Sequence, residues 1–249
     1  MKLGLEGKAC IVTGATRGIG LATVRLLEAE GAHVLAVARS GEDAFHADVT
    51  NAADAERIVG ECVARFGAVD VLVNNAGTSF VRALEELDDN DWQGQWELNV
   101  MGPMRLMRAA APRMAAAGGG RIVNVCSSSG KRPSLTNAAY SVTKAAQLSL
   151  SRHFADRWVG DGVLVNAVAP GPVSSPLWLA DGGLADQAAQ ARGVTREEAL
   201  AAQQAKVPLG RFAEPEEIAA VIVFLCSARA STVAGAAWSA DGGTVPTFL

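Results

Sequence analysis

The fold is determined by the segment Thr13-Gly14-Ala15-Thr16-Arg17-Gly18-Ile19-Gly20 and by what lies on either side of it. Residues 9–12 (ACIV) precede it as a short apolar run, typical of a strand that is buried on both faces of a parallel sheet. Apolar residues then recur at helical spacing up to Gly31, and a second apolar run follows at residues 34–37. A strand, a glycine-rich turn, a helix and a strand begin a dinucleotide-binding βαβ unit. Glycines allow close backbone approach, and the helix N-terminus offers N–H groups to a diphosphate.

The spacing of the glycines narrows the class of nucleotide. Gly14, Gly18 and Gly20 form the pattern G-x-x-x-G-x-G, whereas the common dinucleotide pattern is G-x-G-x-x-G. The turn does not end in Gly-Lys followed by Ser or Thr, which excludes a P-loop. A purely structural loop is the alternative for such a turn taken alone. Its position directly after a buried strand favours dinucleotide binding.

The residues after the second strand indicate which dinucleotide is bound. An acidic residue about 20 positions past the glycines would accept the ribose 2′-hydroxyl of NAD. This chain has Ala38 and Arg39 there. Arg39 and Arg17 could hold a 2′-phosphate by charge-assisted hydrogen bonds. We therefore predict a preference for NADP(H), with NAD(H) as the alternative; the two arginines could instead be solvated surface residues. Asp48, after a short third strand at residues 44–47, could contact the adenine ring.

The rest of the chain alternates between helices and buried strands, with no linker and no internal repeat. Further strands are expected at 69–73, 121–125, 163–168 and 236–239, and helices at 52–66, 92–114 (bent near 102–103), 138–150 and 216–226. We therefore predict one domain over residues 1–249: an α/β Rossmann fold with a doubly wound parallel sheet of about seven strands flanked by helices. The irregular or helical insert at about 176–207 is predicted to be a substrate lid.

Composition excludes several classes of protein. Of 249 residues, 49% are hydrophobic and 19% charged, which argues against disorder, and a net charge of −4 without a basic block argues against a nucleic-acid partner. No signal peptide or membrane-spanning run is present, so a cytoplasmic location and no membrane partner are expected. The cysteines, Cys10, Cys62, Cys126 and Cys226, lack metal-binding spacing; no metal site is predicted, and Cys10 and Cys126 are expected to be buried free thiols.

Tyr140 and Lys144 indicate acid/base chemistry. Tyr140 is the single tyrosine of the chain, and Lys144 follows it by four residues, so both would lie on one face of a helix. A neighbouring ammonium favours the phenolate and would lower the tyrosine pKa from about 10. The pair is thus a candidate general acid/base near neutral pH. A core tyrosine with a lysine nearby by chance is the alternative.

Taken together, the motifs resemble those of the short-chain dehydrogenase/reductase family over almost the whole chain, including its 3-oxoacyl-acyl-carrier-protein reductase-like, NADP-preferring members. The matching positions are Thr13-Gly14-x-x-x-Gly18-Ile19-Gly20, Asn74-Asn75-Ala76-Gly77, Asn99, Ser127, Tyr140-x-x-x-Lys144 and Pro170-Gly171.

The resemblance implies an oxidoreductase that transfers a hydride between NADP(H) and a carbonyl or secondary alcohol. It implies that Tyr140 exchanges a proton with the substrate oxygen, while Lys144 lowers the tyrosine pKa and holds the nicotinamide ribose. Ser127 would stabilise charge on that oxygen, and Asn99 would anchor a proton-relaying water. The implied cofactor contacts are Gly14, Thr16, Arg17, Gly18, Ile19, Gly20, Arg39, Asp48, Val49, Asn75, Ala76, Gly77, Tyr140, Lys144, Pro170, Gly171, Val173 and Ser175.

Substrate and assembly are less narrowly defined. Candidate substrate-facing residues are Ser79, Ser129, Lys131, Leu177, Trp178 and Leu179; Trp178 suggests an apolar wall, or simple packing of the lid. The resemblance implies a homotetramer or homodimer through residues 138–159 and 216–226, with close approach at Ala145, Ala146, Ala219 and Ala220. Two alternative functions are an NADP-binding regulator without turnover and an NAD-dependent alcohol or diol dehydrogenase.

Overall fold

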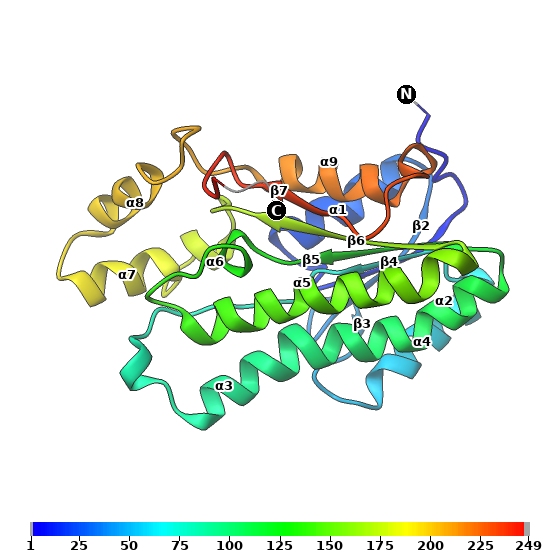
Figure 1. Ribbon diagram of the computed structural model, residues 1–249, viewed down its shortest axis with the longest axis horizontal. Helices are drawn as coiled ribbons and strands as arrows, with labels where there is room; N and C mark the ends of the chain where they lie inside the picture. Colours follow the sequence, from blue (N-terminus) through cyan, green and yellow to red (C-terminus); the bar gives the residue numbers. More distant parts are fainter. Residues whose placement is uncertain (1, 247–249) are drawn as a thin grey trace.

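The computed structural model describes residues 2–246, which build a seven-stranded parallel sheet with helices on both faces (Figure 1). The strand order is β3-β2-β1-β4-β5-β6-β7, so the chain runs outward from β1 to one edge and then from β4 to the other. The predicted doubly wound parallel sheet is therefore confirmed. The strands are β1 (Ala9–Thr13), β2 (His33–Ala38), β3 (Phe45–His46), β4 (Val71–Asn74), β5 (Gly120–Val125), β6 (Val163–Pro170) and β7 (Ala237–Ala240).

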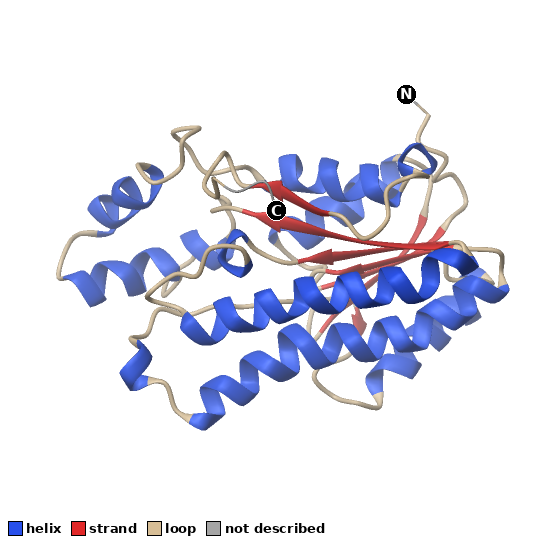
Figure 2. Ribbon diagram, in the orientation of Figure 1, coloured by secondary structure: helices blue, strands red, loops and turns tan. Residues whose placement is uncertain are grey.

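Two helical layers cover the sheet (Figure 2). Helices α1 and α9 lie on one face, and α2, α4 and α5 lie on the other. The α-helices are α1 (Gly18–Ala29), α2 (Asp54–Phe66), α3 (Asp89–Trp96), α4 (Gly102–Ala116), α5 (Ala138–Trp158), α6 (Pro176–Leu179), α7 (Leu184–Arg192), α8 (Arg196–Gln204) and α9 (Pro215–Cys226). Short 3₁₀ turns are η1 (Leu84–Glu86), η3 (Ser128–Gly130), η4 (Val159–Asp161) and η5 (Ala228–Ala230).

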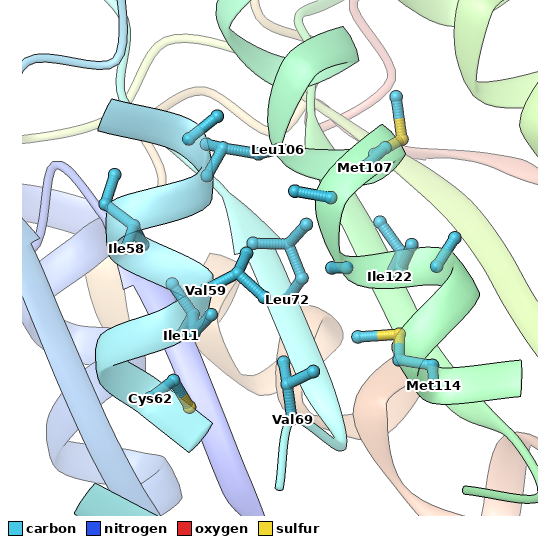
Figure 3. Close-up of a cluster of buried hydrophobic side chains, with 14 of the residues drawn as sticks. Ile11, Ile58, Val59, Cys62, Val69, Leu72, Leu106, Met107, Met114 and Ile122 are labelled. Atoms are coloured by element: carbon cyan, nitrogen blue, oxygen red, sulfur yellow. The ribbon is translucent and has the colours of Figure 1, made fainter. Parts of the chain in front are cut away.

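The apolar strands separate two cores because successive side chains of a strand point to opposite faces. Ile11 and Leu72 belong to the core under α2 and α4, whereas Val12 and Val73 belong to the core under α1 and α9. In the first core, side chains of α2 and α4 surround Leu72 (Figure 3). Burying one such side chain contributes about 1.5–3 kcal/mol. The central strands are thus a rigid support for the loops at their ends.

The helix expected at 92–114 is interrupted one turn earlier than predicted. Between α3 and α4 lies a π-helical turn, η2 (Glu97–Met101), which contains Asn99. Pro103 has no N–H, so the Asn99 carbonyl lacks the donor that an α-helix would place four residues later. The irregular turn is compatible with this missing donor, and it puts the fully buried Asn99 side chain against α5.

The insert after β6 is helical and lies beyond the carboxyl ends of the strands, where it forms the left side of Figure 1. Its two ends meet in a bridge between Val173 and Ala213. Ser174 N–H donates to the Ala213 carbonyl (2.8 Å), and Ala213 N–H donates to the Pro172 carbonyl (3.0 Å). Residues 176–204 therefore leave and re-enter the domain at one point.

Several surface and thiol expectations can be compared with the structure. Ala145 and Ala220 are exposed, but Ala219 is completely buried within its own chain, so its predicted place in a subunit contact is wrong. Cys10 and Cys126 are buried free thiols, as predicted, and so are the other two cysteines. Within residues 2–246, no helix combines the length and the apolar character that a membrane crossing requires.

Candidate active site

A cleft of about 1450 Å³ opens between the carboxyl ends of the strands and the insert. Every residue predicted to contact the cofactor lines it: Gly14, Thr16, Arg17, Gly18, Ile19, Gly20, Arg39, Asp48, Val49, Asn75, Ala76, Gly77, Tyr140, Lys144, Pro170, Gly171, Val173 and Ser175. Ser127 also lines the cleft, whereas Asn99 lies behind its wall. The topology thus gathers residues from six separate loops at one edge of the sheet.

The glycine turn at one end of the cleft is packed too closely for side chains. A Cβ atom on Gly20 would lie 2.1 Å from the Gly14 carbonyl oxygen, and Gly14 itself has φ +64°. The Asn75 amide donates to the carbonyls of Thr13 (2.8 Å) and Gly14 (3.1 Å), which fixes the turn to the end of β4. Helix α1 begins there without a side-chain cap and without an acidic residue in its first turn. Its free N–H groups and this bare backbone fit the diphosphate of a dinucleotide.

Two arginine side chains lie near the glycine turn. Arg17 and Arg39 are exposed in the cleft, and neither forms an ion pair with a carboxylate among the described residues. The residues after β2 that line the cleft, Arg39 and Ser40, are not acidic, and Glu42 and Asp43 further along the loop do not line it. Asp48 lines the cleft, but its carboxylate also accepts hydrogen bonds from the N–H (2.9 Å) and hydroxyl (2.8 Å) of Thr50. The donor set at this end therefore suits a dinucleotide with an added phosphate.

The candidate acid/base lies in the first turn of α5. Burial raises the pKa of Tyr140 to about 12, and a hydrogen bond with the Ser127 hydroxyl opposes this shift. Ser127 is placed by the end of β5, where Cys126 N–H donates to the Val168 carbonyl of β6 (2.7 Å). The expected lowering of the tyrosine pKa is therefore wrong for this structure. Burial outweighs any effect of the neighbouring cation.

Lys144, the cation next to Tyr140, is itself buried and hydrogen-bonded. Its side chain is 2% exposed, and Nζ lies 5.6 Å from the centre of the Tyr140 ring. Nζ donates to the Val125 carbonyl and to Oε1 of Gln147, both at 2.9 Å. Burial lowers the lysine pKa to about 8. The ammonium is thus held by two acceptors in the wall of the cleft.

Asn99 faces the same buried region. Its amide nitrogen donates to Gln95 Oε1 (2.8 Å) and Thr143 Oγ1 (3.1 Å), and its Oδ1 has no hydrogen-bond partner among the described atoms. A Cβ atom built on Gly77 would lie 3.5 Å from Asn99 Oδ1 and 3.6 Å from Lys144 Nζ. Both polar atoms therefore face one small space beside Gly77. An unpartnered buried oxygen and a buried ammonium suit a bridging water there.

The predictions for the substrate side are partly wrong. Ser79, Ser129, Leu177 and Trp178 line the cleft, and the Trp178 ring also packs edge-on against Phe212 (5.2 Å). Lys131 does not line it: Nζ donates to the Ala237 carbonyl (2.7 Å) and Ser239 Oγ (3.0 Å) of β7. Leu179 is exposed outside the cleft.

Other residues at the site were not predicted. Gln95, Thr143 and Gln147 form its buried polar neighbours, and Arg192 and Lys206 of the insert line the cleft. Gln95 stands four residues before Asn99, and Gln147 three after Lys144, so helical spacing was a usable signal. The positions of Arg192 and Lys206 in the cleft could not be predicted from the sequence, because they depend on the path of the insert.

Comparison with known proteins agrees with this arrangement. The family described as enoyl-(acyl carrier protein) reductase matches residues 14–245. The 3-oxoacyl-acyl-carrier-protein reductase of Thermotoga maritima is 36% identical, over 97% of this chain and 99% of its own length. The chain belongs to the short-chain dehydrogenase/reductase family. The resemblance inferred from the motifs is thus confirmed, and the protein is an oxidoreductase.

Other relatives of this short-chain dehydrogenase/reductase act on different compounds. The cis-4-hydroxycyclohexanecarboxylate dehydrogenase of Sinomonas cyclohexanicum is 38% identical, with coverage of 95% of this chain and 96% of its own. A crystal structure of L-sorbose reductase from Gluconobacter frateurii, complexed with NADPH and L-sorbose, superposes with a TM-score of 0.92 at 34% identity and full coverage of both chains. The fold is therefore shared across enzymes named for acids, sugars and thioesters.

Proposed function

We propose that this enzyme transfers a hydride between NADP(H) and a carbonyl or secondary alcohol, with Tyr140 as the general acid/base. The observation that carries this proposal is the position of Tyr140. Its phenol shares one cleft with the Ser127 hydroxyl and with the glycine turn, and the Lys144 ammonium lies beneath it. A pure binding protein needs the turn but has no use for a phenol in the cleft with a buried ammonium next to it.

NADP(H) is the cofactor that the cleft fits. Gly14, Gly20 and the N-terminus of α1 would hold its diphosphate, and Arg17 and Arg39 its 2′-phosphate. The NADPH complex of the similar L-sorbose reductase supports this assignment. When bound, the cofactor supplies or accepts the hydride.

The side chains of the enzyme handle the proton. With a pKa of about 12, the Tyr140 phenol is protonated at neutral pH and is ready to donate to a carbonyl oxygen. The Ser127 hydroxyl donates a hydrogen bond to the same oxygen and stabilises its developing charge. The Lys144 ammonium would stabilise the phenolate that remains, and it would hold the ribose hydroxyls of the bound cofactor. Lys144 would then return a proton to the phenolate, and a water on Asn99 Oδ1 would carry the replacement proton to the neutral lysine amine.

The substrate is proposed only as a class, a small carbonyl or alcohol compound. Leu177 and Trp178 provide an apolar wall, and Arg132, Arg192 and Lys206 line the same cleft without ion pairs to described carboxylates. A substrate panel should therefore contain oxo acids paired with their methyl esters, sugars, and 3-oxoacyl thioesters.

The decisive experiment measures NADPH oxidation over this panel with the wild-type enzyme and with Tyr140→Phe. Phe keeps the ring and removes the hydroxyl, so turnover should fall by at least about 100-fold, the usual range for a general acid. NADPH binding, followed by its fluorescence, should persist. Turnover that survives in Tyr140→Phe would refute the assigned role. NADPH binding without turnover of any compound would favour the regulator, and equal kcat/KM for NADH and NADPH would favour the NAD-dependent alternative.

We also propose that the chain forms a homotetramer or homodimer through α5 and α9. Val142 and Ala145 form an exposed apolar strip on α5, with Val142 50% exposed. Light scattering should give a multiple of the 25.7 kDa chain mass, whereas a monomeric mass would refute this.

A further inference from the structure

The strongest unexplained feature of the site is Gln147. It lies one turn after Lys144 on the inner face of α5 and is 1% exposed. Its Oε1 accepts from Lys144 Nζ at 2.9 Å, while its Nε2 has no partner among the described atoms. A buried amide donor without a partner is destabilising, whereas an apolar residue of similar size would fill this place without that cost. A glutamine here is therefore consistent with a role for its oxygen.

The Gln147 oxygen contacts the Lys144 ammonium, whose charged form has few other stabilising partners. The titratable groups that face Lys144 are Tyr140, from the same helix, and Cys126, at the end of β5. No carboxylate forms an ion pair with Lys144 within residues 2–246. Only the Val125 carbonyl and Gln147 Oε1 accept from Nζ there. Burial lowers the pKa of Lys144, and Cys126 opposes this shift. Hydrogen bonds to the two acceptors also favour the charged form of the lysine.

The two acceptors also leave one N–H group of the Lys144 ammonium without a partner in the described part of the chain. An ammonium has three N–H groups. With two directed at Val125 and Gln147, one remains for the side on which Tyr140 and the space beside Gly77 lie. In the function proposed above, that side receives the ribose hydroxyls and the phenolate.

We propose that Gln147 is a positioning residue for Lys144: its side-chain oxygen keeps the ammonium charged and orients its remaining N–H toward Tyr140 and the cofactor ribose. This inference rests on the proposed function for its role in turnover. Its effect on the lysine can be measured without turnover.

Two substitutions of similar length separate this role from simple packing. Gln147→Met removes the acceptor and should lower the pKa of Lys144. Gln147→Glu replaces it by an anionic acceptor and should raise that pKa. Ser151→Ala is the control, because Ser151 lies on the same buried face of α5 but bonds to Asn124 and not to Lys144.

The first measurement is Tm against pH from 6 to 10, without added cofactor. A lysine with a pKa near 8 in the fold and about 10.4 when unfolded binds fewer protons in the folded state between these values. Stability from this group therefore rises with pH across that window. Relative to wild type, Gln147→Met should be most destabilised at low pH and recover as pH rises. Gln147→Glu should show the opposite slope, and Ser151→Ala should show none.

The second measurement is the pH profile of kcat with the best substrate of the panel. Hydrogen bonds to charged groups are strong enough to move the alkaline limb by about one pH unit. It should move downward in Gln147→Met and upward in Gln147→Glu. The inference would be overturned if both variants showed the wild-type dependence of Tm on pH and the wild-type alkaline limb of kcat. It would also be overturned if these quantities moved in the same direction in both variants. If one variant fails to fold, the sign obtained with the other still decides. If no compound is turned over, the proposed function fails while the Tm measurement still tests Gln147.

Discussion

Replacing Gly20 by alanine should damage the cofactor end of the cleft. A Cβ atom on residue 20 would lie 2.1 Å from the Gly14 carbonyl oxygen and 2.5 Å from Asn75 Nδ2, well inside any allowed contact. The neighbours are backbone and a fixed amide, so α1 would have to move away. That movement would break the two hydrogen bonds from Asn75 to the turn.

The size of the effect follows from these contacts. Overpacking costs about 1–3 kcal/mol, and each lost neutral hydrogen bond about 0.5–1.5 kcal/mol. With two hydrogen bonds lost, we therefore expect a loss of about 2–6 kcal/mol. At about 2–4 °C per kcal/mol for a chain of this size, Tm should fall by roughly 4–24 °C. The increase in Tm on adding NADPH should also shrink, since the displaced turn no longer fits the diphosphate.

The matched control is Gly60→Ala. Gly60 lies within α2, and a Cβ atom there would meet no atom within 4 Å. Alanine is favoured over glycine in a helix by about 0.5–1 kcal/mol, so this variant should gain stability and keep the full NADPH shift. Differential scanning fluorimetry with and without NADPH measures both quantities. The reasoning fails if Gly20→Ala keeps the Tm and the NADPH shift of Gly60→Ala.

Three further predictions concern other parts of the site. Arg39→Ala should raise the KM for NADPH about tenfold or more and leave that for NADH unchanged, because a charge-assisted hydrogen bond to the 2′-phosphate is lost; an unchanged KM for NADPH would refute the assignment. Lys131→Ala should lower Tm by a few degrees, because two hydrogen bonds to β7 are lost, and should change kcat/KM by less than about twofold. A large loss of kcat/KM would instead indicate that Lys131 contacts the substrate. The rate of carbonyl reduction should fall as pH rises through about 8, because the buried Lys144 then loses the charge that stabilises the phenolate; a rate that stays flat to pH 9.5 would contradict this.

The sheet and the glycine turn were predictable because their signals are local. Apolar runs such as residues 9–12 are buried on both faces, and only glycine tolerates the approach of residue 20 to Gly14. The position of Tyr140 on a helix followed from its neighbours in the same way. These features depend on residues close in sequence.

The errors arose where distant segments decide the outcome. The pKa of Tyr140 depends on how deeply α5 is buried, and Lys144 is directed by Val125, 19 residues away. Lys131 reaches β7, more than 100 residues along the chain. Ala219 was assigned to a subunit contact, but an alanine on a helix packs equally well inside its own domain. None of these partners is marked by local pattern or spacing.

The bridge between Val173 and Ala213 makes the segment from 176 to 204 an exchangeable cassette. Because its ends meet in two backbone hydrogen bonds that no side chain supplies, a segment of another sequence or length can be joined at the same points. Doubling the length of such a loop adds only about 0.6 kcal/mol of closure cost. The glycine turn and the residues around Tyr140 lie outside the cassette. We therefore expect that the substrate range can change, in evolution or by grafting, while the residues proposed to handle hydride and proton are kept.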